Sequence, residues 1–189
     1  MLRTDDRPAR PELTEPVMAW RAWTLSTGRR GVRLEPIAGR RSAWPPGEPA
    51  RASCPRHCRP VPGLLCLCGL YATRDPLLLR QARSPAAIGR VALWGRIVEH
   101  DHGYRAAFGY PARLALVCMF CFWQWGPQRA RADVVARLRR GRLLPLCEPH
   151  VATANRYGFR TPDPTPAHRV QAALLDAYAV DVLPLQVDG

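Results

Sequence analysis

The stretch Arg90-Val-Ala-Leu-Trp-Gly-Arg-Ile-Val-Glu99 decides the fold, because it carries the clearest β-strand pattern in the chain. A strand with apolar side chains on both faces is typical of the centre of a sheet. Glycines at Gly95 and Gly109 indicate bends or bulges, as in a strongly curved sheet or a small barrel. The alternation places Ala92, Trp94 and Val98 near one face and Val91, Leu93 and Ile97 on the other.

The flanking residues predict further strands. Residues 100–103 read as a turn, and residues 104–110 as the returning partner strand. Pro111 is expected to break the ladder, since it has no N–H to donate, and residues 114–122 are expected to begin another strand. Upstream, residues 20–25 and 32–37 predict a hairpin whose turn contains Gly28 and Gly31.

Helices are predicted at four places. Residues 76–83 follow Asp75, a good N-cap, and begin with a proline at the first helical position. The other three are residues 130–140, 149–157 and about 167–179, with a short strand at 143–146. The predicted fold is α+β. We expect a disordered tail over residues 1–16, followed by a curved antiparallel sheet or small barrel over residues 17–115. A zinc-finger-like module of treble-clef or ribbon type is then expected over residues 116–160, and a linker with a C-terminal helix over residues 161–189.

Charge and cysteine content limit the function. The chain has a net charge of +13, and it contains arginine but no lysine. This balance favours anionic partners, above all nucleic acid, although part of the arginine excess fits a GC-rich coding sequence. The first residues carry no apolar secretory segment, and the longest apolar run, 114–123, is about half of the ~20 residues that a membrane helix needs. We therefore expect a cytoplasmic protein with reduced thiols and no membrane partner.

Two pairs of ligand-type residues in the C-terminal half predict a zinc site. Cys118 and Cys121 form C-x2-C, and Cys147 and His150 form C-x2-H. Two intervening residues let a knuckle or a first helical turn direct both side chains at one ion, and Cys3His is a common set for structural zinc. The alternatives are buried core cysteines with a chance C-x2-H, and a redox C-x-x-C. Redox activity would need a helix start at the first pair, and none is predicted there.

A second cluster of ligand-type residues lies in the proline-rich middle of the chain. Its spacing is irregular, and C-x-C is a weaker signal than paired C-x2-C. If this cluster binds a metal, we expect Cys54, Cys66 and Cys68 as ligands, with His57 or Cys58 as the fourth. The alternative is a group of thiols folded under a proline-rich loop.

Part of the chain resembles a known group of proteins. The stretch Ile88-Gly-Arg-Val-Ala-Leu-Trp-Gly-Arg-Ile-Val-Glu-His100, followed by Gly103-Tyr-Arg-Ala106 and Tyr110-Pro111, resembles a segment of uncharacterised cysteine-containing proteins from GC-rich Gram-positive bacteria. Cys66-Leu-Cys-Gly-Leu-Tyr-Ala72 and Trp44-Pro-Pro-Gly-Glu-Pro49 are similar to the same group. The resemblance covers roughly residues 40–115. It implies a shared fold and a bacterial, cytoplasmic origin, and it brings no activity.

Three functions remain open. The first is a non-catalytic, zinc-stabilised protein that binds nucleic acid or regulates, with Trp123 and Trp125 able to stack on bases. The second is a protein–protein adaptor. The third, less favoured, is a thiol- or zinc-dependent enzyme, for which the middle cluster is the place to look. The nucleic-acid contacts predicted for the first are the arginines of the expected helix and its flanks: Arg129, Arg131, Arg137, Arg139, Arg140 and Arg142.

Overall fold

The computed structural model describes residues 15–29, 31–37, 43–161 and 163–185, so that most of the predicted tail, 1–16, lies outside the described residues. The described chain is α+β, with one ten-stranded, mostly antiparallel sheet. The strands are β1 (Val17–Gly28), β2 (Gly31–Pro36), β3 (Ala50–Arg51), β4 (Leu70–Thr73), β5 (Ala87–His100), β6 (Gly103–Leu116), β7 (Val134–Arg137), β8 (Arg142–Leu146), β9 (Thr165–Pro166) and β10 (Asp181–Val182). The helices are α1 (Met119–Trp125), α2 (Glu148–Arg156) and α3 (Ala167–Tyr178), with 3-10 turns η1 (Pro76–Gln81), η2 (Pro127–Arg129) and η3 (Arg139–Gly141).

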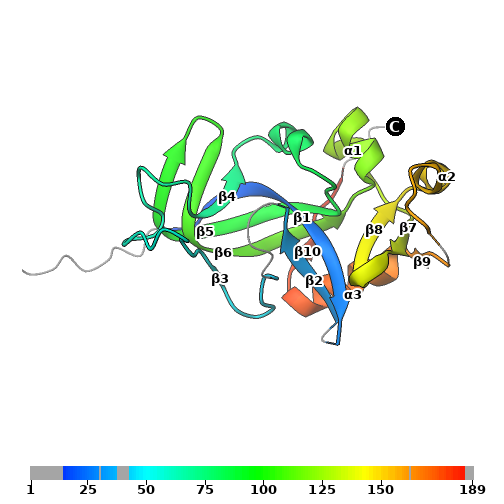
Figure 1. Cartoon of the computed structure of the whole chain (residues 1–189), viewed down its shortest axis with the longest axis horizontal. Coiled ribbons are helices and arrows are strands. Elements are labelled where there is room, and N and C mark those ends of the chain that lie inside the picture. Colours follow the sequence, from blue (N-terminus) through cyan, green and yellow to red (C-terminus); the bar gives the residue numbers. More distant parts are fainter. Residues whose placement is uncertain (1–14, 30, 38–42, 162, 186–189) are drawn as a thin grey trace, which may run out of the picture.

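The strand pairings close into a ring. The predicted central strand, β5, pairs with β1 on one side and with β6 on the other. The short β4 then pairs with β6 and, through Trp20 and Thr73, with β1. Strong curvature needs a bend in the long β5–β6 hairpin, and the register shifts between Trp94 and Ile97 around Gly95, at φ +72°. The expectation of a curved antiparallel sheet is met by this closed set of pairings (Figure 1).

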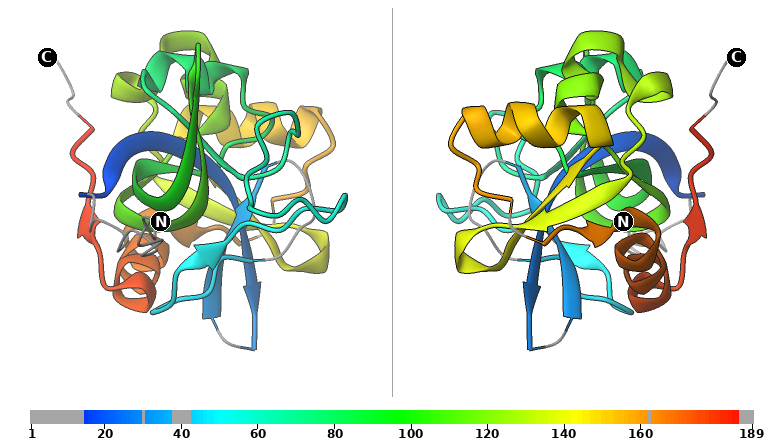
Figure 2. Two further views of the ribbon diagram at one scale, coloured as in Figure 1. Left: turned by 90° about the vertical axis from the view of Figure 1, so that its left-hand side faces the viewer. Right: turned by 90° about the vertical axis from the view of Figure 1, so that its right-hand side faces the viewer.

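Helices lie on both sides of the strands. Figures 1 and 2 show α1 and η1 on one side and α3 on the opposite side. The core against α3 contains Trp23, Leu34 and Leu174, all fully buried. Tyr178 of α3 ties this layer together, because its hydroxyl donates to the Trp44 carbonyl at 2.7 Å and accepts from the Leu34 amide at 3.0 Å. Among the residues that the structure describes, no helix has the length and apolar character needed to cross a bilayer.

Two predictions about β6 and its end are wrong. Pro111 does not break the ladder: β6 continues from Gly103 to Leu116, and Pro111 opposes Val91 where the register shifts between Arg90 and Val91. A proline is tolerated at such a bulge, where one residue is left out of the hydrogen-bonded ladder. The strand expected at 114–122 ends at Leu116, and the chain turns into α1 from Met119.

The helix predicted at 130–140 is also wrong. This segment contains η2, the strand β7 and the turn η3. Val134 and Val135 are β-branched, which favours a strand, and they pair with Leu146 and Pro145 of β8, where Val135 is buried. Gly141 closes the hairpin at φ +72°, with its Cα against the backbone of Thr27. Of the arginines assigned to one helix, Arg137, Arg139, Arg140 and Arg142 lie on this hairpin instead, whereas Arg129 and Arg131 precede it.

Candidate metal centres

The four predicted C-terminal ligands lie together. One atom from each of Cys118, Cys121, Cys147 and His150 lies within 4.8 Å of the others, so the cluster could hold a metal ion. The Sγ atoms of Cys121 and Cys147 are 3.5 Å apart. His150 directs Nδ1 at the sulfurs, at 3.0 Å from Cys147, 3.3 Å from Cys121 and 3.5 Å from Cys118. We call these residues the C-terminal cluster.

Two helix starts build the C-terminal cluster. Cys118 is the N-cap of α1 and Cys121 is its third residue; Cys147 and His150 hold the same positions in α2. In each pair the first turn brings residues three apart onto one side of the helix. The free N–H groups at both helix starts also favour negative charge on the thiols. The expectation of no helix start at Cys118 is therefore wrong, and a helix opens each half of the site.

A second cluster forms in the middle of the chain, here called the N-terminal cluster. It contains Cys54, Cys58, Cys66 and Cys68, whose sulfurs all lie within 4.8 Å of one another, and it could also hold a metal ion. The Sγ atoms of Cys54 and Cys66 are 3.7 Å apart. Of the two alternatives for the fourth residue, Cys58 joins the cluster, whereas His57 is exposed at φ +55° outside it.

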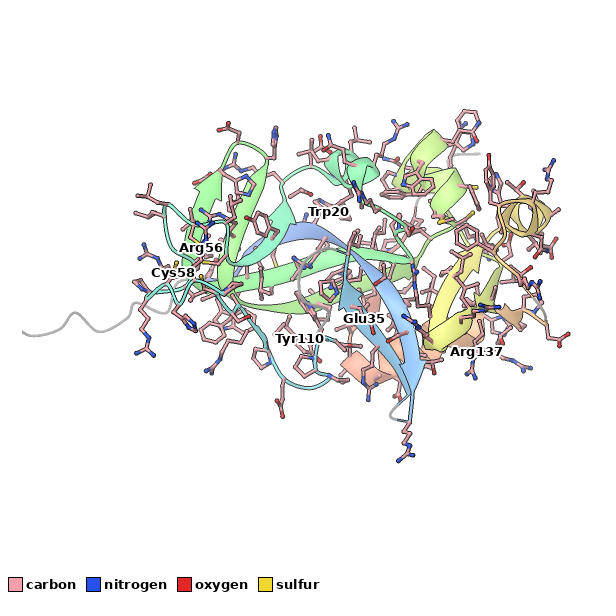
Figure 3. The ribbon with its side chains drawn as sticks, in the orientation of Figure 1. Trp20, Glu35, Arg56, Cys58, Tyr110 and Arg137 are labelled. Atoms are coloured by element: carbon pink, nitrogen blue, oxygen red, sulfur yellow. The ribbon has the colours of Figure 1, made fainter. Side chains whose placement is uncertain are left out.

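The thiols in these clusters are not disulfides. All seven cysteines are free, and all seven belong to one cluster or the other. The printed Sγ–Sγ distances of 3.5 and 3.7 Å are far longer than the ~2.05 Å of a disulfide bond. Figure 3 places Cys58 near one end of the long axis, and α1 and α2 lie toward the other end (Figure 1).

Crowding perturbs the acidity of the thiols. Burial raises the pKa of Cys121 and of Cys147. In the N-terminal cluster, hydrogen bonds with the Cys54 and Cys66 thiols raise the pKa of Cys58 to about 12, whereas the Cys58 backbone amide lowers the pKa of Cys54 to about 6. Several thiolates at these separations repel one another, and a cation among them removes that penalty.

Arg105 fixes the loop that carries the N-terminal cluster. This arginine of β6 is 7% exposed. Its Nη1 donates to the carbonyl oxygens of Gly63 (3.2 Å), Cys68 (3.1 Å) and Cys66, and its Nη2 to that of Leu64 (3.4 Å). No sequence pattern points to this role, because an arginine at an alternating strand position is usually a solvated side chain.

The arginines predicted to contact nucleic acid fall into two groups. Arg129 lies with its guanidinium 6.0 Å from the exposed Trp125 ring, and Arg131 forms a bridge with Val117. The remaining residues lie at the β7–β8 hairpin: Arg137 ends β7, Arg139 and Arg140 lie in η3, and Arg142 begins β8. Trp123 is held at η1, because its Nε1 donates to the Ala82 carbonyl at 3.0 Å.

In each cluster four ligand atoms surround one position, which suits a tetrahedral metal ion. Comparison with known proteins adds no further assignment. No protein-family model, curated protein or solved structure matches this chain.

Proposed function

We propose that both clusters hold zinc and that the ion is structural. A tetrahedral zinc site with ordinary bond lengths places two sulfurs ~3.8 Å apart, and a sulfur and a nitrogen ~3.6 Å apart. The observed separations of 3.5–3.7 Å and 3.0–3.5 Å support this assignment. Four protein ligands in each cluster fill the coordination shell, as in structural sites, whereas catalytic zinc keeps an open position. In the C-terminal cluster the β7–β8 hairpin lies between two ligand-bearing helix starts, an order similar to that of zinc-finger-like modules.

The choice of fourth ligand in the N-terminal cluster can be tested directly. We expect Cys58→Ala to lose one of two zinc ions per chain, because its thiol belongs to the cluster, and His57→Ala to keep both. Elemental analysis of the two purified variants measures this difference. Equal zinc contents in the two variants, or loss of zinc only from His57→Ala, would contradict the ligand set.

We further propose that the protein binds nucleic acid through one basic end of the sheet. Ser26 of β1 lies between two arginines, since it pairs with Arg33 of β2 and with Arg142 of β8. Laterally paired residues point to the same face of a sheet, so both arginines extend from the face opposite Leu25, which pairs with buried Leu34 and Leu143.

Further arginines join this face. Arg29 lies at the exposed tip of the β1–β2 hairpin, and Arg139 and Arg140 lie exposed in η3, whose Gly141 packs against Thr27. We call Arg29, Arg33, Arg139, Arg140 and Arg142 the arginine end. The ion pair found among the described residues joins Arg74 and Glu99 elsewhere, so none of these arginines has a described carboxylate as its partner. Arg33 Nη1 donates to the Val32 carbonyl at 2.8 Å, and the other N–H groups of the arginine end can donate to phosphates. This clustering of arginines from two strands, a hairpin tip and a 3-10 turn carries the proposal.

A salt titration tests the arginine end. Each phosphate contact contributes ~0.7–0.9 to the slope of log K against log salt concentration. We expect the double variant Arg33→Gln/Arg142→Gln to bind a short labelled oligonucleotide more weakly and with a slope shallower by about 1.5. The matched control is Arg56→Gln/Arg59→Gln, which removes the same amount of positive charge far from the arginine end. Figure 3 shows Arg56 near one end of the molecule and Arg137 toward the other. Equal losses in the two double variants, or binding that does not respond to salt, would refute this interface.

A second candidate function has its own observation. Leu64, Leu65 and Leu67 are exposed on the loop of the N-terminal cluster, and Leu65 has its full surface in solvent. Apolar side chains presented on a rigid zinc-held loop suit contact with another protein, which would make the chain an adaptor. A bound protein that survives nuclease and high salt, and is lost when Leu65 is changed to serine, would favour this function over the first.

A further inference from the structure

A cavity of about 590 Å³ lies between β1, β4 and the segment around β3. Its wall includes Trp20, Trp44, Tyr71 and the edge of the N-terminal cluster at Cys68. The lining is mostly apolar, and the volume lies within the ~300–1,000 Å³ of typical small-molecule sites. Neither zinc proposal nor the arginine end accounts for this space.

Two buried polar atoms on the cavity wall have no partner. Among the residues that the structure describes, Arg21 Nε and His100 Nε2 are buried without a hydrogen bond, and both residues line the cavity. A buried donor or acceptor left unsatisfied costs about 1–3 kcal/mol, so such atoms call for a partner. Arg21 and His100 are therefore side chains of the cavity wall whose hydrogen-bonding capacity the protein does not use in full.

The charge of the wall is positive and uncompensated. Arg21 and Arg51 are in the lining, and the described lining residues include no Asp or Glu. The Arg21 guanidinium lies 5.0 Å from the Trp44 ring centroid, and its Nη1 donates to the Tyr71 carbonyl. Burial lowers the pKa of Arg21 to about 10, which still leaves it cationic at neutral pH. A fixed cation held against an aromatic ring in a mostly apolar cavity is suited to bind an anion.

We propose that this cavity binds a small organic anion. The carboxylate or phosphate of the ligand pairs with the Arg21 guanidinium, and the apolar body of the ligand fills the space between Trp20, Trp44 and Tyr71. His100 lies on the same wall. This site is independent of nucleic-acid binding, because none of its residues belongs to the arginine end.

The test uses two fluorescent probes of one shape and different charge. The anion 8-anilinonaphthalene-1-sulfonate carries an aromatic body and one negative group; N-phenyl-1-naphthylamine lacks the sulfonate. We expect one equivalent of the anion to bind per chain, and Arg21→Gln to weaken it at least about tenfold while the neutral probe changes little. The control Arg90→Gln removes a β5 arginine that lies over Trp20 from outside the cavity lining, and should change neither probe.

A second variant keeps the proposal open to refutation if Arg21→Gln fails to fold, as judged by circular dichroism and melting. Ser53 lies exposed at the cavity wall, so Ser53→Trp narrows the cavity without disturbing the core, and both probes should be lost. Unchanged binding of the anionic probe to Ser53→Trp overturns the cavity as the site. Equal weakening of both probes in a folded Arg21→Gln overturns the role of the charge.

Discussion

Changing Cys147 to serine is expected to lower the zinc content from two ions per chain to one and to unfold the region between β6 and the end of α2 at ordinary temperature. The C-terminal cluster joins α1, α2 and, through them, the buried residues Met119, Leu144 and Leu146. Structural zinc contributes ~10–16 kcal/mol of apparent binding energy in zinc-finger peptides. That is comparable to the ~5–15 kcal/mol of net stability of most domains, so we expect loss of this ion to remove the fold of the region that it joins.

The N-terminal cluster provides the matched control for this result. Cys66→Ser also removes one thiol and one zinc, but from a loop at the edge of the sheet rather than from between two helices. We expect a much smaller fall in melting temperature for Cys66→Ser than for Cys147→Ser, with the same loss of one zinc in elemental analysis. Two findings would contradict the assignment: wild-type protein without bound zinc, or Cys147→Ser that melts like the wild type.

The strands and ligands that were predicted correctly have local signals. The alternation of residues 90–99 places β5 at the centre of the sheet, and the Gly28–Gly31 turn gives the β1–β2 hairpin. Each C-terminal ligand pair has C-x2 spacing, which a single helical turn can satisfy without knowledge of the rest of the chain. That the two pairs meet depends on long-range folding, which the spacing does not show. Their combination into one site was predicted from ligand chemistry, because three cysteines and one histidine form a common set for structural zinc. Local periodicity and ligand chemistry are therefore enough for these elements.

The failures arise where tertiary contacts outweigh local preference. Residues 130–140 carry apolar spacing that suits a helix, yet β8 offers a pairing partner and the segment extends. Pro111 was expected to end a strand, but a bulge opposite Val91 removes the need for its missing N–H. Arg21 and Arg105 could not be found, because their roles depend on residues 37–50 positions away in the sequence.

Apart from its four cysteines, Arg105 is expected to be the most important side chain for the N-terminal cluster. Its guanidinium satisfies four carbonyl groups of the cysteine loop, at Gly63, Leu64, Cys66 and Cys68. A planar group with five N–H donors can reach several acceptors at once, and its positive charge also compensates the negative charge of nearby thiolates. We expect Arg105→Met to cost about 3 kcal/mol or more, because the carbonyls lose their shared donor while they remain partly enclosed.

In a chain of this size each kcal/mol changes the melting temperature by about 2–4 °C, so Arg105→Met should melt about 6–12 °C below the wild type. It should also release one of its two zinc ions to a colorimetric chelator faster than the wild type, because the loop that carries the ligands is no longer fixed. Arg113→Met on the same strand is the control, since Arg113 is exposed and a surface change alters stability by no more than about 0.5 kcal/mol.

Arg105→Lys should fall between the wild type and Arg105→Met, because one ammonium keeps the charge but cannot span four carbonyls. In a Cys66→Ser background, which lacks the N-terminal zinc, Arg105→Met should accelerate no further release. Acceleration that persists there, or wild-type melting and release in Arg105→Met alone, would show that the arginine does not hold this cluster.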